Sequence, residues 1–107
     1  MTAGQQSLGR GVALFGRVWP GGAAPAYDDG VVVVSPDGLV AAMGPVGSVA
    51  LPEGVRRLGG AGAWVGPGIV DAHVHLAFGS PAQMLRGGVV GVRDLGAPMA
   101  MARRWRT

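Results

Sequence analysis

The chain of 107 residues contains no cysteine and no lysine. The absence of cysteine excludes a disulfide framework and a zinc site built from thiolates, and it is typical of proteins in a reducing cytoplasm. All nine basic residues are arginines, and six acidic residues leave a formal net charge of +3. Because almost nothing titrates between neutral pH and the arginines, this small excess raises the isoelectric point to about 11.1. The high isoelectric point is therefore a weak sign of nucleic-acid binding.

Long apolar runs and a targeting signal are also missing. No segment approaches the roughly 18 consecutive apolar residues of a membrane span, and the first ten residues lack the pattern of a secretion signal. The single arginine cluster, over residues 103–106, lies where a solvated helix end is the commoner explanation. The sequence predicts a soluble, cytoplasmic protein without a nucleic-acid or membrane partner, and it leaves the oligomeric state open.

Glycine and proline are abundant instead, with 21 and 8 residues, a level that low-complexity chains also reach. However, 49% of the residues are hydrophobic, whereas disordered segments are poor in valine and leucine. Residues 1–66 have the pattern of an all-β segment in which turns separate short strands. Strands are predicted at residues 12–15, 17–19, 31–34, 39–43, 55–58 and 63–65, the last two separated by glycines at positions 59, 60 and 62.

The clearest local signal is a hairpin around Ser35-Pro-Asp-Gly38, which joins the third and fourth of these runs. Proline fixes the first central dihedral of such a turn, and glycine accepts a positive φ.

Beyond residue 67 the pattern changes to strand, short helix, strand. A strand over residues 68–76 precedes Ser80-Pro81, which offers a helix N-cap followed by proline at the first helical position. Gly87 and Gly88 end that helix, and a second buried strand over residues 89–92 leads to Arg93-Asp94 and to a helix that starts near Pro98. Such a βαβ unit predicts a parallel pair of strands, whose C-terminal ends gather ligands in α/β folds.

The only two histidines, His73 and His75, lie two residues apart in the first of these strands. A strand sends alternate side chains to opposite faces, so Asp71 shares a face with both. Two interpretations stay open on spacing alone: polar groups satisfied within the strand, or half of a metal site, because imidazole is a common zinc ligand. Since Ile69-Val70 begins like a strand buried on both faces, these polar groups need partners, and a cation would supply one.

Residues 64–76 and 88–96 resemble two motifs of the amidohydrolase superfamily of metal-dependent hydrolases, in particular its imidazolonepropionase-like and cyclic-amidase branches. The first contains Pro-Gly-Ile-Val-Asp-Ala-His-Val-His and is similar to the start of that family's barrel. The second, Gly-Val-Val-Gly-Val-Arg-Asp-Leu-Gly, is similar to the end of the second barrel strand. The β-rich remainder resembles the family's N-terminal sandwich more loosely.

The resemblance implies that residues 1–66 are part of a small β-sandwich and that residues 67–107 begin a (β/α)₈ barrel with its first βαβ unit, both domains being incomplete. It makes His73 and His75 ligands of a divalent metal ion, by preference zinc. A metal-activated water would attack an amide or cyclic amide, which is hydrolysis of a carbon–nitrogen bond other than a peptide bond. Asp71 would orient a histidine. Asp94 with Arg93 would form a pair at the barrel rim that is either structural or supports a metal ligand, with a plain salt bridge as the favoured interpretation.

Departures from the family pattern limit what these residues are expected to do alone. A barrel of this kind needs about 200 residues, no third histidine or lysine exists, and Val90 and Gly91 stand where threonines are usual. We therefore expect an inactive, truncated fragment of low solubility, whose full-length parent takes a small-molecule amide. Two alternatives remain: a non-catalytic β-rich interaction module with incidental histidines, and a small basic binding protein that uses the C-terminal arginines.

Overall fold

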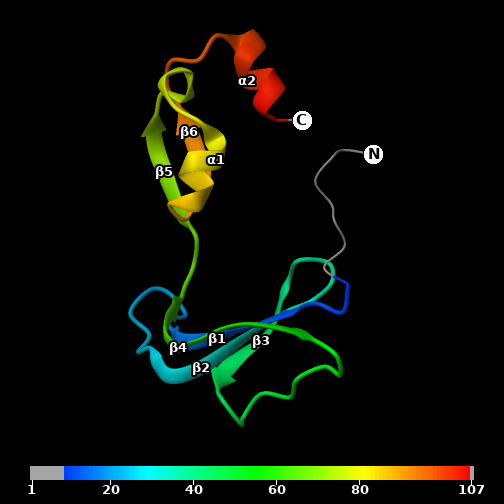
Figure 1. The fold of residues 1–107 in the computed structure, drawn as a ribbon. Coiled ribbons are helices and arrows are strands. Elements are labelled where there is room, and N and C mark those ends of the chain that lie inside the picture. Colours follow the sequence, from blue (N-terminus) through cyan, green and yellow to red (C-terminus); the bar gives the residue numbers. More distant parts are fainter. Residues whose placement is uncertain (1–8, 107) are drawn as a thin grey trace. The chain divides into compact units, whose positions relative to one another are not determined.

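The structure, a computed structural model, describes residues 9–106. It divides at Pro67 and Gly68 into two compact units. The first unit contains four strands, and the second contains two strands and all the helices of the described chain (Figure 1). This division does not test whether the first unit is part of a β-sandwich and the second part of a (β/α)₈ barrel, and that assignment stays a prediction.

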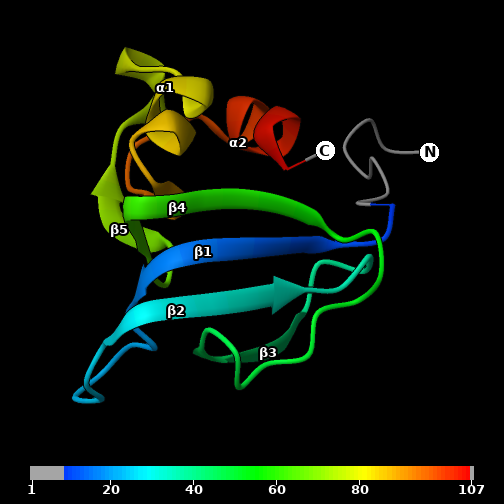
Figure 2. The same cartoon turned by 60° about the horizontal axis from the view of Figure 1, so that its bottom comes forward.

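The first unit is built on one four-stranded sheet. Its strands are β1 (Val12–Val18), β2 (Tyr27–Val34), β3 (Val40–Pro45) and β4 (Arg56–Val65), in the order β3-β2-β1-β4 (Figure 2). β2 runs antiparallel to both of its neighbours, and β4 runs parallel to β1. The described residues of this unit thus form a β domain with a single sheet.

The predicted hairpin is present between β2 and β3. The amide of Gly38 donates to the carbonyl oxygen of Ser35 at 2.9 Å, and the amide of Ser35 donates to the carbonyl oxygen of Leu39 at 2.8 Å. Gly38 has a φ of 82°, a conformation that residues with a Cβ rarely adopt. The hairpin prediction is confirmed, and Gly38 has the positive φ that the sequence predicts.

The glycines at positions 59, 60 and 62 do not separate two strands, so the prediction of a break there was wrong. β4 continues through them, but its pairing with β1 jumps from Phe15↔Gly59 to Arg17↔Trp64. Gly59, with a φ of 83°, leaves no room for a Cβ beside the carbonyl group of Phe15. These glycines therefore form a bulge within one strand, where positive φ serves the same purpose as in a turn.

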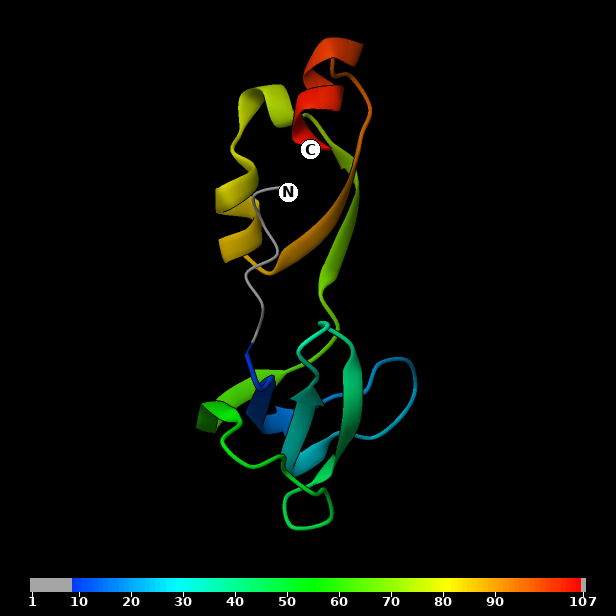
Figure 3. The ribbon, with the colours of Figure 1, turned by 90° about the vertical axis from the view of Figure 1, so that its right-hand side faces the viewer.

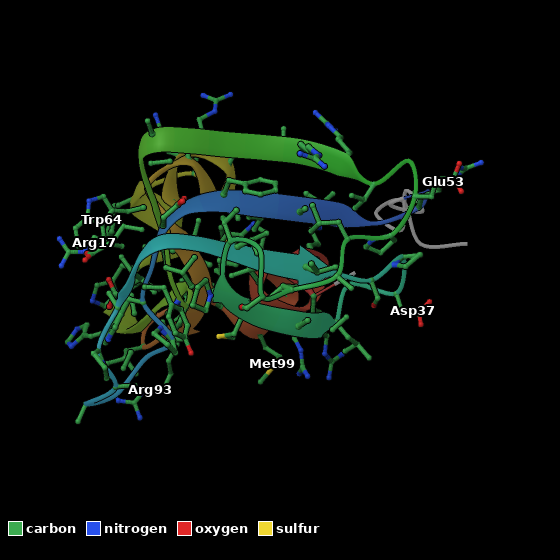
Figure 4. All side chains as sticks on the ribbon, turned by 90° about the horizontal axis from the view of Figure 1, so that it is seen from below. Arg17, Asp37, Glu53, Trp64, Arg93 and Met99 are labelled. Carbon is green, nitrogen blue, oxygen red and sulfur yellow. The ribbon has the colours of Figure 1, made fainter. Side chains whose placement is uncertain are left out.

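The end of the bulge brings two side chains of neighbouring strands together. The guanidinium group of Arg17 lies 4.8 Å from the ring centroid of Trp64, and the two are adjacent in Figure 4. Arg17 also forms an ion pair with Asp28 at 3.2 Å. Both contacts are exposed, so they contribute little to stability.

Val12 and Val32 are buried on one face of the sheet of the first unit, and an apolar cluster lies on the other face. Its buried centre consists of Ala13, Val31 and Val33, and the apolar side chains packed against it are Phe15, Ala42, Val49, Leu51 and Val55. The last three belong to the connection between β3 and β4, which therefore covers this face of the sheet.

The second unit begins with β5 (Ile69–Val74) and a 3₁₀ turn, η1 (Leu76–Phe78). The helix α1 (Pro81–Arg86), the strand β6 (Val89–Asp94) and the helix α2 (Met99–Trp105) follow. β5 and β6 run side by side and parallel (Figure 3). In their register Ile69 is opposite Val89 and Val74 is opposite Asp94. The strand, helix, parallel strand order is as predicted, and Ser80 is the N-cap of α1 although its side chain makes no capping hydrogen bond.

The prediction that Ile69 and Val70 begin a strand buried on both faces was wrong for this structure. Their exposed fractions are 57% and 70%, and the buried apolar residues of the second unit are Val74 and Leu76. A two-stranded sheet with one short helix against it cannot cover both of its faces.

The helices of residues 9–106 are short, and none of them is long and apolar enough to cross a membrane.

Candidate metal centre

His73 and His75 lie at the C-terminal end of β5. His73 is in the strand, and His75 follows the strand's last residue, Val74, at a φ of −129° and a ψ of 83°. Their ring centroids are 5.3 Å apart, and the ring planes meet at 71°. Both side chains are exposed. The alternation of a strand therefore brings the two imidazoles together, as the spacing predicts.

Asp71 contacts the same segment through the main chain. One oxygen of its carboxylate accepts a hydrogen bond from the backbone amide of His73 at 3.0 Å. The expected bond to an imidazole ring is replaced by this local bond to the backbone, which is typical of aspartate two residues before a donor. Asp71 can thus hold the strand backbone that carries His73.

Asp94 connects the ends of the two strands. One carboxylate oxygen accepts from the amide of Leu76 at 2.9 Å, and the other accepts from the amides of Gly96 and Ala97 at 2.8 and 2.7 Å. The bond from Gly96, then that from Leu76, lowers the pKa of Asp94 below its usual value of 3.8, and the nearby His75 adds to this effect. Asp94 is therefore an ionised clamp between the start of η1 and the loop after β6.

Arg93 does not pair with Asp94, so the favoured salt-bridge interpretation was wrong. The Nε of Arg93 donates to the carbonyl oxygen of Ala72 at 2.9 Å, whereas the carboxylate of Asp94 accepts backbone amides. Successive residues of a strand point to opposite faces, so two neighbours in β6 reach different partners. Arg93 instead strengthens the attachment of β6 to β5.

One residue near the histidines was not predicted from the sequence. A Cβ added to Gly96 would lie 2.9 Å from Nδ1 of His75, so this glycine leaves the space that the ring needs. The signal available was its position, two residues after the Asp94 that ends β6.

The distance between the two imidazole rings suits ligands that share one tetrahedral cation. Two ligands are too few, however, for a complete site of that kind. Rings that share such an ion at Zn–N distances of about 2.0–2.1 Å have centroids about 5 Å apart, which agrees with the observed 5.3 Å. Among residues 9–106, however, no group of three or more histidine or acidic side chains is placed to hold a metal ion. Among the described residues, the two imidazoles thus lie close together without a third histidine or acidic side chain placed to share an ion with them.

A groove of the second unit lies apart from the histidines. It has a volume of about 620 Å³ and lies between α1, β6 and α2, with an apolar lining that includes Met84, Val90 and Trp105. Neither histidine lines it, although Leu76 and Asp94 do. The histidine pair is therefore an open surface feature beside this groove.

Comparisons with known proteins find relatives that are similar to about half of this chain. No family model matches. An imidazolonepropionase of Stenotrophomonas maltophilia is 40% identical over 50 residues, which are 47% of this chain and 12% of the relative. A deacetylase of Brucella anthropi is 44% identical over 48 residues, or 45% and 11% of the two chains. An imidazolonepropionase of Pseudomonas putida is 41% identical over 54 residues, or 50% and 13%.

The fold also has a counterpart among solved structures. A structure of molinate hydrolase matches with a TM-score of 0.74 and 20% identity, covering 91% of this chain and 26% of that protein. The matched parts of the curated relatives are only 11–13% of their lengths, so the chain corresponds to a small part of each. Names and fold agree with the two sequence motifs: the chain resembles an N-terminal segment of the amidohydrolase superfamily.

Proposed function

We propose that His73 and His75 are two ligands of a divalent metal ion, by preference zinc, in a hydrolase that cleaves carbon–nitrogen bonds other than peptide bonds. The observation that carries the proposal is the pair of exposed imidazoles with centroids 5.3 Å apart at the C-terminal end of a strand. The similarity of the chain to imidazolonepropionases and a deacetylase supports the reaction class. In parallel α/β folds this end of the strands is where ligands gather.

The division of work between the metal and the chain follows from the chemistry of the residues. A bound zinc ion polarises a carbonyl group and lowers the pKa of a water molecule. His73 and His75 offer imidazole nitrogens as ligands for such an ion, and the carboxylates of Asp71 and Asp94 hold the backbone around them. The substrate in this proposal is a small-molecule amide or cyclic amide.

We infer that these 107 residues alone hydrolyse no amide at a measurable rate and hold metal weakly. Catalytic zinc sites commonly combine three protein ligands with an open position for water, and the chain has two histidines and no lysine. β5 and β6 would supply the first two strands of a (β/α)₈ barrel, whose remaining strands would complete the ligand set. The parallel pairing of β5 and β6 supports this proposal.

The test is zinc binding by the full 107-residue chain, measured by titration calorimetry. We expect one weak site in the wild-type chain and none in the double variant His73→Ala, His75→Ala. The matched control is Gln83→Ala, an exposed position in the same unit, which should bind as the wild type does. Equal zinc uptake by the double variant would contradict the proposal and would favour a non-catalytic β-rich module.

A further inference from the structure

We infer that Gly96 and Asp94 are positioning residues that keep the imidazole of His75 beside that of His73. The inference deepens the proposed function, because it concerns the same pair of rings. Its basis is the way in which the loop after β6 fits against the residue that follows β5. Neither residue would itself contact a metal ion or a substrate.

Gly96 contributes empty space at a specific place. A Cβ at this position would lie 2.9 Å from Nδ1 of His75, closer than real Cβ contacts come, and 3.3 Å from Cε1, which is a tight contact. Gly96 is not among the glycines with positive φ, so its backbone conformation is open to other residues. The requirement for glycine at this position therefore comes from the His75 ring and not from backbone strain.

Asp94 keeps Gly96 at that distance. Its two oxygens join the amide of Leu76, the residue after His75, to the amides of Gly96 and Ala97. The amide of Leu95 adds a bond to the carbonyl oxygen of Val74 at 3.1 Å. The main chain on either side of His75 is thus tied to the loop that contains Gly96.

Two aromatic rings also lie near the His75 ring. The ring of His73 lies 5.3 Å away, and the ring of Phe78 lies 6.3 Å away at an interplanar angle of 65°. Because a side chain on residue 96 would occupy the space beside Nδ1, the ring would have to rotate or shift relative to His73. A small steric change in the loop is therefore expected to alter the geometry of the pair.

The decisive variant is Gly96→Ala, and the matched control is Gly79→Ala. Gly79 has a φ of −145° and nothing within 4 Å of an added Cβ, so alanine fits there without strain or clash. The chain has only two histidines, so the imidazole ¹H–¹⁵N NMR spectrum of the metal-free protein reports each ring separately. Gly96→Ala should shift the His75 signals and weaken the cross-relaxation between the two rings, whereas Gly79→Ala should preserve both.

The same variants are then titrated with zinc. Gly96→Ala should raise the dissociation constant by roughly 10–100-fold, the usual effect of altering the groups that orient a metal ligand. Gly79→Ala should stay within about twofold of the wild type, as surface substitutions do. If Gly96→Ala leaves both the ring signals and the zinc affinity as in Gly79→Ala, the inference is overturned.

Asp94→Asn provides a second variant, independent of Gly96→Ala, in which the side chain keeps the shape of aspartate. An asparagine side chain has one acceptor oxygen, so in either orientation its amide group opposes at least one of the backbone amides that Asp94 binds. We expect a smaller shift of the His75 signals than in Gly96→Ala, with thermal unfolding as the check that the fold persists. Unchanged His75 signals in this folded variant would refute the role of Asp94.

Failure of the proposed function can be told apart from failure of this inference. If the wild-type chain binds no zinc, the metal proposal fails, and the positioning of His75 is judged on the ring signals of the metal-free variants alone. If zinc binds and Gly96→Ala changes neither readout, the positioning inference fails while the metal proposal stands.

Discussion

The two units of this chain bury their apolar side chains to very different extents. Six of the eight buried apolar residues in the described chain belong to the first unit: Val12, Ala13, Val18, Val31, Val32 and Val33. The second unit buries only Val74 and Leu76, while residues such as Val70, Val90 and Met99 are more than 60% exposed. Both units contain similar valine-rich strands, so composition alone does not decide which strand is covered.

The two units differ in how many apolar side chains their connecting segments pack against their own strands. In the first unit the connection between β3 and β4 returns three apolar side chains to the sheet: Val49, Leu51 and Val55. In the second unit the groove between α1, β6 and α2 stays open. A strand whose sequence predicts burial can thus stay exposed when no apolar segment of its own unit packs on it. The histidine pair consequently lies on an open surface.

The largest effect on stability that tests this difference in burial is expected when one apolar residue in each unit is replaced by aspartate. Val31→Asp should lower the free energy of unfolding of the first unit by about 3–5 kcal/mol, because Val31 is 1% exposed and an unpaired buried charge is costly. Val90→Asp should change the free energy of unfolding of the second unit by less than about 0.5 kcal/mol, because Val90 is 63% exposed. Urea unfolding followed by circular dichroism measures both, and equal losses would contradict the contrast in burial.

A smaller effect is expected from the bulge of β4. Gly59 and Gly47 have similar positive φ values, 83° and 89°, but only Gly59 faces a main-chain carbonyl group, that of Phe15. Gly47→Ala should cost about 1–2 kcal/mol from backbone strain alone. Gly59→Ala should cost more in the same thermal unfolding assay, because the added Cβ also separates β4 from β1. If the two variants lose equal stability, the bulge is not closely packed.

The smallest expected effect is a pH dependence in the second unit. Folding lowers the pKa of Asp94, so its carboxylate stabilises the folded state above the usual value of 3.8. This contribution is lost as the pH falls below that value and through the lower pKa of the folded state. The stability difference between the wild type and Asp94→Asn should therefore shrink on acidification. A constant difference across that range would mean that ionisation of Asp94 is unimportant.

Local chemistry predicted much of the first unit and the order of elements in the second. Proline and glycine around Ser35 determine a hairpin because the turn involves neighbouring residues only. The glycines near Gly59 were assigned to a break between strands because positive φ serves turns and bulges alike. The pairing with β1, more than 40 residues away in sequence, decides between them.

In the candidate site, too, only the features that depend on residues close in sequence could be predicted. Strand alternation was sufficient to place His73 beside His75. The partners of Asp94 were not predictable, because its bond to Leu76 joins residues 18 positions apart and depends on the parallel register of β5 and β6. The space left by Gly96 depends on the same register, so no pattern within one strand indicates it.

The most direct test of the account is a zinc titration of the metal-free chain observed through the imidazole ¹H–¹⁵N signals of His73 and His75. The account predicts that both rings respond along one common binding curve, since the two imidazoles share one ion. A response of only one ring, or of neither, would contradict the claim that these two histidines form a metal-binding pair.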